Sequence, residues 1–493
     1  MRFFQYITKA NGLLRLGVQE GQNIIDLASC DPSIPNNLLD FIRGGENMMK
    51  VANRAMTAKK GDVHKLEDVI VKAPIYGPDK VACVGMNYRD HCEELNAPIP
   101  QEPMFFNKFP SSIAGPNDPI PFPSPTDSLD YEVELALIIG KKGKDIPIET
   151  AMDHIFGYCV AHDVTARDWQ LKKNGGQWLL GKTMEAFCPL GPCVVTRDEI
   201  PDPHSLPIRC YVNGILKQNG NTNKMVHKAD AVVSFLSRFC TLLPGDVILT
   251  GTPPGVGCFR KPPEYLKEKL DHRALAMKNG DIYKMEDIII KAPIIGPDKV
   301  ACVGMNYRDH CEELNVSVPE EPVIFNKFPS SIAGPNEPIP LPSLTEALDY
   351  EVELAVIIGK KGKEIPLESA MDHVFGYCVA HDVTARDWVV QGKNGGQWLL
   401  GKTMDAFCPL GPCIVTRDEI PDPHSLSIRC SINGKLKQNG NTNKMVHRID
   451  AVVSRMSRFC TLLPGDVILT GTPPGVGCFK KPPEYLKSVK LKE

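Results

Sequence analysis

The chain carries one long segment twice, and this internal duplication limits the folds open to it. The run VACVGMNYRDHCEELN begins at Val81 and again at Val300, and GTPPGVGCF begins at Gly251 and again at Gly471. Solenoid proteins repeat every 20–50 residues or so, a far shorter period than the one seen here. A solenoid is therefore excluded. We predict two whole domains in tandem, copy one over residues 54–268 and copy two over residues 273–493.

Residues 1–53 occur once, and we expect them to form a small N-terminal domain. MRFFQYI, LLRLGVQ and NIIDLA have the pattern of short strands, and the run from Ile34 to Met56 has that of a helix. Within each copy, β-like runs such as DYEVELALIIG lie between turns, and the chain contains 43 prolines and 40 glycines. No regular alternation of strand and helix and no glycine-rich phosphate loop is present. These patterns predict an α+β fold that is mainly β.

The composition excludes several functional classes. The 493 residues include 56 basic and 59 acidic side chains in an even mixture, which argues against a general nucleic-acid or membrane-surface binder. No apolar run approaches the roughly 18 residues of a membrane helix, and no leader is apparent at the start. The 17 cysteines include no CxxC pair, so we expect reduced thiols rather than a disulfide framework. We expect an intracellular protein.

Three acidic side chains fall on one face of a predicted strand. In the run DYEVELALIIG, the strand period places Asp130, Glu132 and Glu134 on one side and apolar side chains on the other. Like charges at this spacing repel unless they are protonated, solvated or bridged by a cation. A solvated strand face and a cation site both fit the pattern. Asp163, another acid in a mostly apolar stretch, favours the cation, and carboxylate ligands suit Mg²⁺, Mn²⁺ or Ca²⁺ rather than zinc.

A second pattern places a histidine beside a carboxylate. In the run NYRDHCEE, His91 and Glu94 are three residues apart and would be adjacent on one face of a helix. A neighbouring carboxylate fixes the tautomer of an imidazole and raises its basicity, as a general base requires. A surface helix pair is the alternative. Further polar residues suit an anionic substrate, or else lie on solvated faces: Arg167, Gln170, Lys182 and Thr252.

Together the runs GMNYRDHCEE, DYEVELALIIGKKGK, AHDVTARDWQ, QWLLGKT and PGDVILTGTPPGVG resemble the fumarylacetoacetate hydrolase family over nearly all of the chain. The resemblance implies that family's mixed β-roll in each copy. It implies one Mg²⁺ per functional copy, with Mn²⁺ or Ca²⁺ as alternatives, held by Glu132, Glu134 and Asp163 and by their matches Glu351, Glu353 and Asp382. It implies catalytic roles for His91, Glu94, Gln170 and Lys182, and in copy two for His310, Glu313 and Lys402. It implies substrate binding by Arg167, Thr252, Arg386 and Thr472.

By the same resemblance the substrate is a small dicarboxylate or 2-oxo acid, converted through a metal-bound enolate. Oxaloacetate keto–enol tautomerisation is the reaction we favour. C–C bond hydrolysis of the acylpyruvase type, or oxaloacetate decarboxylation, would use the same site. A non-catalytic duplicated scaffold is the alternative of another class. The family relation also implies a homodimer or an intramolecular pseudo-dimer, and a mitochondrial or cytoplasmic location.

Copy two departs from copy one near the predicted site. Val389 stands where copy one has Gln170, one residue is inserted, and Gln391 lies two positions away. Both copies also lack the closing strands that the family places after KPPEYLK, and an uncovered sheet edge favours aggregation. One hypothesis is that the run GDIYKMEDIIIK, residues 280–291, fills part of this gap for copy one; it equally matches the run GDVHKLEDVIVK at the start of copy one, so both placements stay open. We predict that copy two is truncated and weakened in its chemistry but still binds metal.

Overall fold

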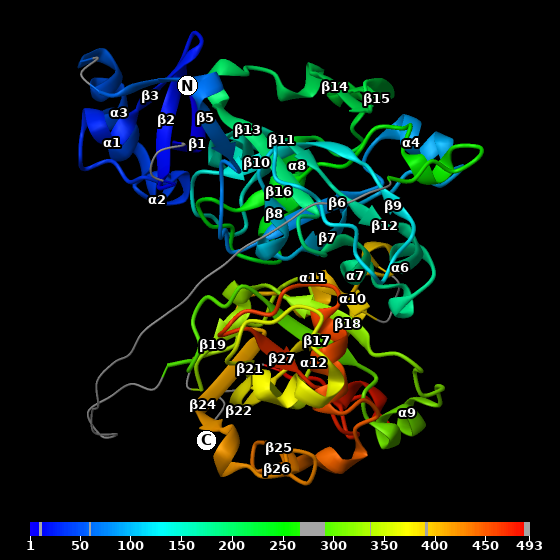
Figure 1. Cartoon of the computed structure of the whole chain (residues 1–493). Coiled ribbons are helices and arrows are strands. Elements are labelled where there is room, and N and C mark those ends of the chain that lie inside the picture. The colour runs from blue at the N-terminus through cyan, green and yellow to red at the C-terminus, as the bar shows by residue number, and fades with distance from the viewer. Residues whose placement is uncertain (9–11, 59–60, 267–290, 336, 390–392, 488–493) are drawn as a thin grey trace. The chain divides into compact units, whose positions relative to one another are not determined.

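The computed structural model describes the chain except for residues 9–11, 59–60, 267–290, 336, 390–392 and 488–493 (Figure 1). The chain divides into two compact units, one of Met1–Asp118 and Thr126–Lys267, the other of Pro119–Pro125 and Glu268–Glu493. Each unit holds one copy of the repeat, so the duplicated sequence corresponds to a duplicated structure. The expected gap filler at 280–291, apart from Lys291, lies outside the described residues. The domain limits given above remain predictions.

Strands of the first unit form one twelve-stranded sheet. They are β1 (Arg2–Thr8), β2 (Leu14–Glu20), β3 (Asn23–Asp26), β4 (Val63–Lys65), β5 (Val69–Lys72), β6 (Val81–Gly85), β7 (Met104–Lys108), β8 (Ile113–Ala114), β10 (Val133–Ile139), β11 (Ile155–His162), β13 (Cys188–Thr196) and β16 (Val247–Leu249). The main path runs β4-β3-β2-β1-β13-β11-β10-β16-β6-β7, with β5 beside β1 and β8 beside β13. Two small ladders pair β9 (Leu129–Asp130) with β12 (Thr165–Ala166), and β14 (Pro207–Val212) with β15 (Ile215–Asn221).

The helices of this unit lie only partly where the patterns predicted them: helices were predicted within residues 34–56 and around residues 89–94, whereas the helix over residues 27–30 begins in a run predicted as a strand. They are α1 (Leu27–Cys30), α2 (Leu38–Arg43), α3 (Gly45–Ala58), α4 (Arg89–Glu94), α5 (Ile148–Ala151), α6 (Arg167–Leu171), α7 (Leu179–Lys182) and α8 (Ala229–Ser237). Helix α2 begins after Asn37, whose side chain accepts a hydrogen bond from the Asp40 N–H and so caps the first turn. The α+β prediction, with strands prevailing, is confirmed.

Residues 1–58, called here the N-terminal module, extend the sheet of copy one. Strand β1 pairs antiparallel with β13, with Arg2 opposite Val195 and Phe3 opposite Val194. Phe3 and Val194 are fully buried in one apolar core that also contains Ala136 of β10. The residues expected to form a small domain therefore share both the sheet and the core of copy one.

The second unit repeats the copy-one part of this architecture. Its seven-stranded sheet has the order β18-β17-β27-β21-β22-β24-β19. The strands are β17 (Val300–Gly304), β18 (Val323–Lys327), β19 (Ile332–Ala333), β21 (Val352–Ile358), β22 (Val374–His381), β24 (Cys408–Thr416) and β27 (Val467–Leu469). Smaller ladders join β20 (Leu348–Asp349) to β23 (Thr384–Ala385), and β25 (Ser427–Ile432) to β26 (Lys435–Asn441). The helices are α9 (Arg308–Leu314), α10 (Arg386–Val389), α11 (Leu399–Lys402) and α12 (Ile449–Ser457).

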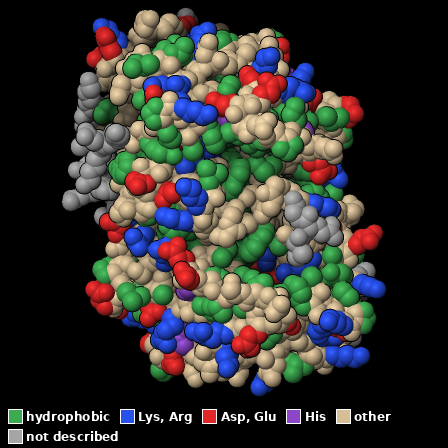
Figure 2. Space-filling model, turned by 90° about the vertical axis from the view of Figure 1, so that its right-hand side faces the viewer, with side chains coloured by type: hydrophobic (Ala, Val, Ile, Leu, Met, Phe, Trp, Pro, Cys, Tyr) green, Lys and Arg blue, Asp and Glu red, His purple; other side chains and the backbone are tan. Residues whose placement is uncertain are grey.

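Strand β10 positions the predicted site because it is the apolar centre of the sheet. All seven of its residues are buried, and it pairs with β11 on one side and β16 on the other. Figure 2 shows one face of the molecule, on which Lys or Arg and Asp or Glu side chains are interspersed. Among the described residues, no helix has the length and apolar character needed to cross a membrane.

Candidate active site

Three carboxylates meet at the start of β10. Glu134 lies in β10, Glu132 precedes it, and Asp163 follows β11. The N–H of Asp163 donates to the carbonyl of Glu132 at 2.8 Å, so the pairing of β10 with β11 ties these two acids together. One oxygen from each carboxylate lies within 4.8 Å of the others, and all three residues are buried. This acid cluster excludes the alternative of a solvated strand face.

Asp130, which the strand period placed on the same face, is held elsewhere. Its carboxylate accepts hydrogen bonds from Arg167 Nε at 2.7 Å, from the Gly257 N–H at 2.7 Å and from the Cys258 N–H at 2.9 Å. The predicted strand is in fact two strands, β9 and β10, with a break at residues 131–132. Because the pleat is interrupted there, the expected alternation is wrong for Asp130 and holds only for the two glutamates.

Buried cations surround the acid cluster. Lys182 Nζ donates to Glu132 Oε2 at 3.0 Å and to Asp163 Oδ2 at 2.7 Å. Lys108 Nζ lies 2.6 Å from Asp163 Oδ1. Arg167 Nη2 lies 2.6 Å from Glu132 Oε1. Buried charges are stable only when they are paired in this way, so each residue of the network depends on the others.

The two glutamates have opposite pKa shifts. Burial by itself would raise the pKa of Glu132, but Arg167 and Lys182 outweigh burial and hold that pKa at about 2. Burial raises the pKa of Glu134 well above its ordinary value, and the charges of Asp163 and Glu132 raise it further. Glu134 Oε2 accepts a hydrogen bond from the Gly251 N–H at 2.6 Å. The negative charge of Glu134 is therefore the least compensated of the three.

This arrangement fits a divalent cation. The donors are three buried carboxylates, which is the oxygen-only set that Mg²⁺, Mn²⁺ and Ca²⁺ prefer. A cation beside Glu134 would favour its ionised form, which burial and its neighbours now disfavour. The acid cluster could thus hold a metal, and the lysines and arginine around it reduce the charge that the metal must balance.

Lys108 belongs to this network, and the sequence analysis missed it. Its ammonium group is fully buried and donates to the carbonyl of Val164 at 2.9 Å, besides pairing with Asp163. A signal was present: Lys108 ends the apolar run MFFNK, and Lys327 ends the matching run VIFNK. A lysine inside a strand that is otherwise buried needs a buried anion as partner.

The predicted histidine–glutamate pair is formed. His91 Nδ1 and Glu94 Oε2 are 2.8 Å apart on α4, and the imidazole is buried. Glu94 Oε1 accepts a hydrogen bond from the Gly255 N–H at 3.0 Å. Gly255 has a φ of +104°, which favours glycine, and a Cβ there would lie 2.4 Å from the Lys217 carbonyl oxygen. The motif GTPPGVG therefore supports the acid of this pair by a backbone contact.

The remaining predicted residues lie in the same region. Gln170 Oε1 accepts a hydrogen bond from Arg167 Nη1 at 2.8 Å. Thr252 Oγ1 donates to the Val133 carbonyl at 2.9 Å and accepts from Gln218 Nε2 at 2.8 Å. Both side chains thus have partners within the protein, and their roles toward a substrate remain predictions.

Copy two builds the same constellation around a cavity of about 150 Å³. Its acid cluster is Glu351, Glu353 and Asp382, and Lys402 Nζ bridges Glu351 at 3.1 Å and Asp382 at 2.8 Å. His310 Nδ1 and Glu313 Oε2 are 2.8 Å apart. The cavity brings together the predicted residues His310, Glu351, Glu353, Arg386, Lys402 and Thr472.

One difference between the copies lies in this cavity. Val389 lines it at the place of Gln170, so Arg386 has no glutamine at that position to receive its Nη1. Arg386 keeps its contact with Asp349, at 2.8 Å from Nε, and its ion pair with Glu351. Gln391, the displaced glutamine, lies outside the described residues. Copy two thus repeats the charged residues of the site, but the glutamine side chain at the position of Gln170 is replaced by valine.

Comparison with known proteins follows the same division into copies. The profile for the fumarylacetoacetate (FAA) hydrolase C-terminal domain matches residues 80–289 and again residues 299–490. The chain belongs to the fumarylacetoacetate hydrolase family. The fold prediction and the family resemblance are thereby confirmed for both copies of this family member.

Relatives within the family are similar to about half of the chain. The Xenopus laevis protein named oxaloacetate tautomerase fahd2, mitochondrial, is 55% identical over 269 residues, covering 54% of this chain and 84% of that protein. Human oxaloacetate tautomerase FAHD2A, mitochondrial, is 53% identical over 255 residues, covering 52% of this chain and 81% of that protein. A solved fumarylacetoacetate hydrolase from Exiguobacterium antarcticum is 40% identical with a TM-score of 0.47, covering 54% of this chain and 92% of that one.

Proposed function

We propose that the chain is a divalent-metal-dependent oxaloacetate keto–enol tautomerase, with copy one as the main catalyst and Mg²⁺ as its ion. The observation that carries the proposal is the acid cluster: three buried carboxylates within 4.8 Å, next to Lys182, of which Glu134 is the least compensated. The names of the frog and human relatives support the reaction. The same names support a mitochondrial location, which we also propose.

Glu132, Glu134 and Asp163 would hold the ion, and their counterparts Glu351, Glu353 and Asp382 would hold one in copy two. Bound there, Mg²⁺ would act as a Lewis acid that lowers the energy of negative charge on the 2-oxo oxygen of the substrate. Arg167 is fixed by Asp130, Glu132 and Gln170, so its guanidinium is oriented in advance for an anionic substrate.

His91 is the residue that we assign to proton transfer. Glu94 engages Nδ1 at 2.8 Å, which leaves Nε2 as the nitrogen that can exchange a proton with substrate. In the enol-to-keto direction, the proton leaves the enol oxygen on C2 and a proton is added at C3. The imidazole carries out this transfer as general base and then as general acid. His310 and Glu313 repeat the pair in copy two.

The test is the disappearance of enol-oxaloacetate, followed by its ultraviolet absorbance with Mg²⁺ or with EDTA. We expect EDTA to abolish the catalysed rate and Glu134→Gln to lower it about 100-fold, because the variant loses a charged metal ligand. The matched variant Glu353→Gln should lower it far less. Equilibrium titration should give two ions per wild-type chain and one in each single variant.

Other outcomes would remove the proposal. A folded wild type without any Mg²⁺-dependent rate on oxaloacetate, but with Mg²⁺-dependent cleavage of an acylpyruvate, would show a C–C bond hydrolase. Release of carbon dioxide from oxaloacetate would show a decarboxylase. A melting temperature that does not respond to Mg²⁺ would favour the scaffold, since an ion that binds only the folded state must raise it. Light scattering would separate a homodimer from an intramolecular pseudo-dimer.

A further inference from the structure

The segment that follows β16 contacts both members of the histidine–glutamate pair in copy one. The Gly255 N–H donates to Glu94 Oε1 at 3.0 Å. The ring of Phe259 packs against the imidazole of His91, with ring centroids 6.2 Å apart and an angle of 60° between the planes. Residues 255–260, called here the site loop, therefore set how firmly Glu94 can hold the imidazole.

Arg260 is the last residue of the site loop and holds it through three hydrogen bonds. Its Nε–H is shared between the Gly255 carbonyl at 3.2 Å and the Tyr131 hydroxyl at 3.1 Å. Its Nη2 donates to the Lys217 carbonyl at 2.6 Å. Gly255 packs against that same carbonyl, since a Cβ at Gly255 would lie 2.4 Å from it. One guanidinium group thus holds both the backbone of Gly255 and the strand β15 on which Gly255 packs.

Copy two has the same loop without this arginine. The residue that matches Arg260 is Lys480. Its Nζ lies 3.5 Å from Glu484 Oε2. The hydroxyl of Tyr350, which matches Tyr131, is buried and has no hydrogen-bond partner in the part of the chain that the structure describes. A lysine has a single donor atom, so it does not reproduce the planar, several-point contact of a guanidinium group.

The two copies nevertheless have the same distance at the contact that the loop supports. The Gly475 N–H donates to Glu313 Oε1 at 3.0 Å, as the Gly255 N–H does to Glu94 Oε1. The copies therefore differ in what restrains the loop and not in its mean position. A restrained loop matters for catalysis, because a reacting group must be held within a fraction of an ångström of its productive geometry.

We propose that Arg260 is a positioning residue for proton transfer. Arg260 restrains Gly255, Gly255 restrains Glu94, and Glu94 orients the imidazole of His91. Lys480 gives copy two a weaker form of the same support, although it does not line the cavity of that site. This inference rests on the proposed function, in which His91 moves the proton.

The first test is the variant Arg260→Lys, which gives copy one the residue that copy two already has in matching surroundings. It is measured on enol-oxaloacetate in a chain whose copy two carries Glu353→Gln, so that copy one supplies the rate. We expect kcat to fall about tenfold, the scale of a lost hydrogen bond to a charged group. KM should change less than about twofold, because the residues assigned to the ion and the substrate are untouched.

The second test needs no turnover and separates positioning from stability. A carboxylate only accepts hydrogen bonds, so Glu94 holds the neutral imidazole with its proton on Nδ1. Nitrogen chemical shifts of the ring report this tautomer, recorded in EDTA at about pH 8, where an ordinary imidazole is neutral. His91 should be almost wholly in the Nδ1–H form in wild type. His310, and His91 in Arg260→Lys, should show more of the Nε2–H form, and Lys480→Arg should return His310 toward Nδ1–H.

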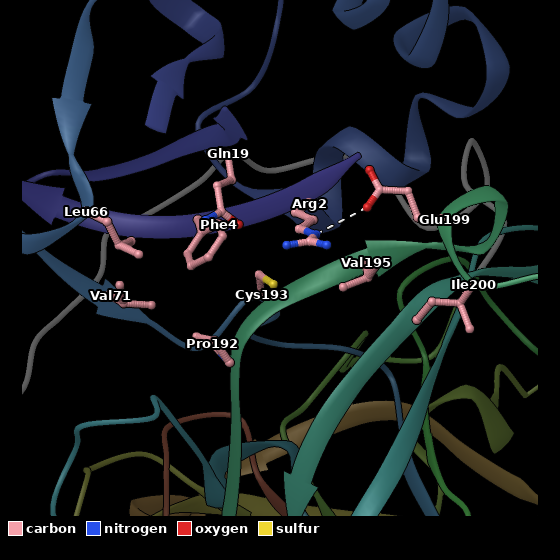
Figure 3. Close-up of a pocket in the computed structure, with 10 residues that line it drawn as sticks. All are labelled: Arg2, Phe4, Gln19, Leu66, Val71, Pro192, Cys193, Val195, Glu199 and Ile200. Atoms are coloured by element: carbon pink, nitrogen blue, oxygen red, sulfur yellow. Dashed lines mark hydrogen bonds and ion pairs between the residues drawn. The ribbon is translucent and has the colours of Figure 1, made fainter. Parts of the chain in front are cut away.

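A matched control replaces an arginine outside the site of copy one. Arg2 Nε donates to Glu199 Oε2 at 3.2 Å beside a cavity of about 420 Å³ between β1 and β13, as Figure 3 shows. Arg2→Lys should leave both kcat and the His91 tautomer unchanged. Circular dichroism and melting temperature establish that each variant is folded.

Several results would overturn the inference. One is a folded Arg260→Lys chain whose kcat and His91 tautomer are unchanged, and another is an equal loss of kcat in Arg2→Lys. A fall in kcat without a change of tautomer, or a raised KM at unchanged kcat, would show that Arg260 does not act through His91. A wild type without any Mg²⁺-dependent rate on oxaloacetate would remove the proposed function instead, and the His91 tautomer would still decide whether Arg260 orients the pair.

Discussion

The two copies agree closely in their buried charges and differ in what surrounds them. Lys108 lies 2.6 Å from Asp163 in copy one, and Lys327 lies 2.7 Å from Asp382 in copy two. Among the described residues, no strand on β24 corresponds to the module that covers β13. The comparison shows that the charge network is encoded within the repeated segment, whereas the edge cover of copy one is encoded outside it and was not duplicated.

The largest effect that could break this agreement is the loss of a central lysine. Lys182→Met removes the ammonium group that Glu132 and Asp163 share and leaves each acid with a single buried cation, so we expect copy one to lose about 3–5 kcal/mol of unfolding free energy in EDTA. Lys402→Met should cost copy two a similar amount. Hydrogen exchange of β10 and of β21 measures each copy separately.

An exposed ion pair serves as the control for these variants. Lys65 and Glu67 lie 3.7 Å apart with both side chains mostly exposed, so Lys65→Met should cost less than about 1 kcal/mol. The two lysine variants can also be compared with each other. A large loss of unfolding free energy for Lys182→Met in copy one, without a similar loss for Lys402→Met in copy two, would show that the two networks differ in energy despite their matching distances.

The next effect is the loss of stability that protonation of Asp26 causes at low pH. It should act on copy one alone, because Asp26 belongs to the N-terminal module. Burial would raise the pKa of Asp26 in the N-terminal module, but hydrogen bonds from Arg15, Tyr6 and the Ser29 N–H outweigh burial and lower it. A lowered folded-state pKa stabilises the module above the ordinary value of 3.8, and this stability is lost as pH falls through the folded-state value.

Asp26→Asn should therefore cost about 2 kcal/mol at pH 7 and flatten the acid dependence. Hydrogen exchange of β1 and β2 as a function of pH is the measurement, with exchange of β24 as the internal reference. If β24 showed the same acid dependence as β1, the module would not be its source.

A smaller effect is expected when the glutamine of copy one and the valine of copy two are each replaced by the residue of the other copy. Gln170→Val removes the acceptor of Arg167 Nη1 and should lower kcat/KM about tenfold, as a hydrogen bond to a charged group would. Val389→Gln should raise the activity of copy two. Each substitution is measured in a chain whose other copy carries the Glu→Gln metal-ligand variant. An unchanged rate for both would show that this position does not distinguish the copies.

The smallest effect distinguishes the two strand edges by the reactivity of their cysteines. Burial raises the pKa of Cys193 to about 11, and β1 and β5 pack beside it. Cys413, the matching residue, is exposed. Cys413 should react with iodoacetamide about tenfold faster than Cys193, as measured by peptide mass spectrometry. Equal rates would indicate that the edge of β24 is covered in solution.

Local patterns predicted the acids and the histidine of the site because both depend on short spacings. Glu132 and Glu134 follow from strand alternation, and His91 with Glu94 from helix geometry. The pairing of Lys108 with Asp163, and the hydrogen bonds that hold Asp130 away from the acid cluster, could not be predicted in this way. Their partners, Asp163 and Gly257, are distant in sequence, and the break between β9 and β10 leaves no mark in the apolar pattern.

The N-terminal module illustrates the same limit for the fold. Its strands and the helical run after Ile34 were predicted, whereas α1 was not, and the pairing of β1 with β13 joins residues more than 190 positions apart. No local propensity encodes such a pairing, and it is decided by the apolar surface that Phe3 and Val194 bury together. A small domain and an extension of the sheet have the same local sequence pattern.

Identical strands also create an ambiguity during synthesis. The sequences VIL of β16 and VACVG of β6 recur unchanged in β27 and β17. Val247 pairs with Val81, 166 residues earlier, while the identical Val300 lies only 53 residues later. Loop closure favours the shorter, incorrect pairing by about 1 kcal/mol. Folding as the chain leaves the ribosome resolves the ambiguity, because β6 and β16 can pair before β17 has been made. Refolding of the full-length chain from denaturant lacks that order, so misassembled species are expected from the denatured protein and not from the ribosome.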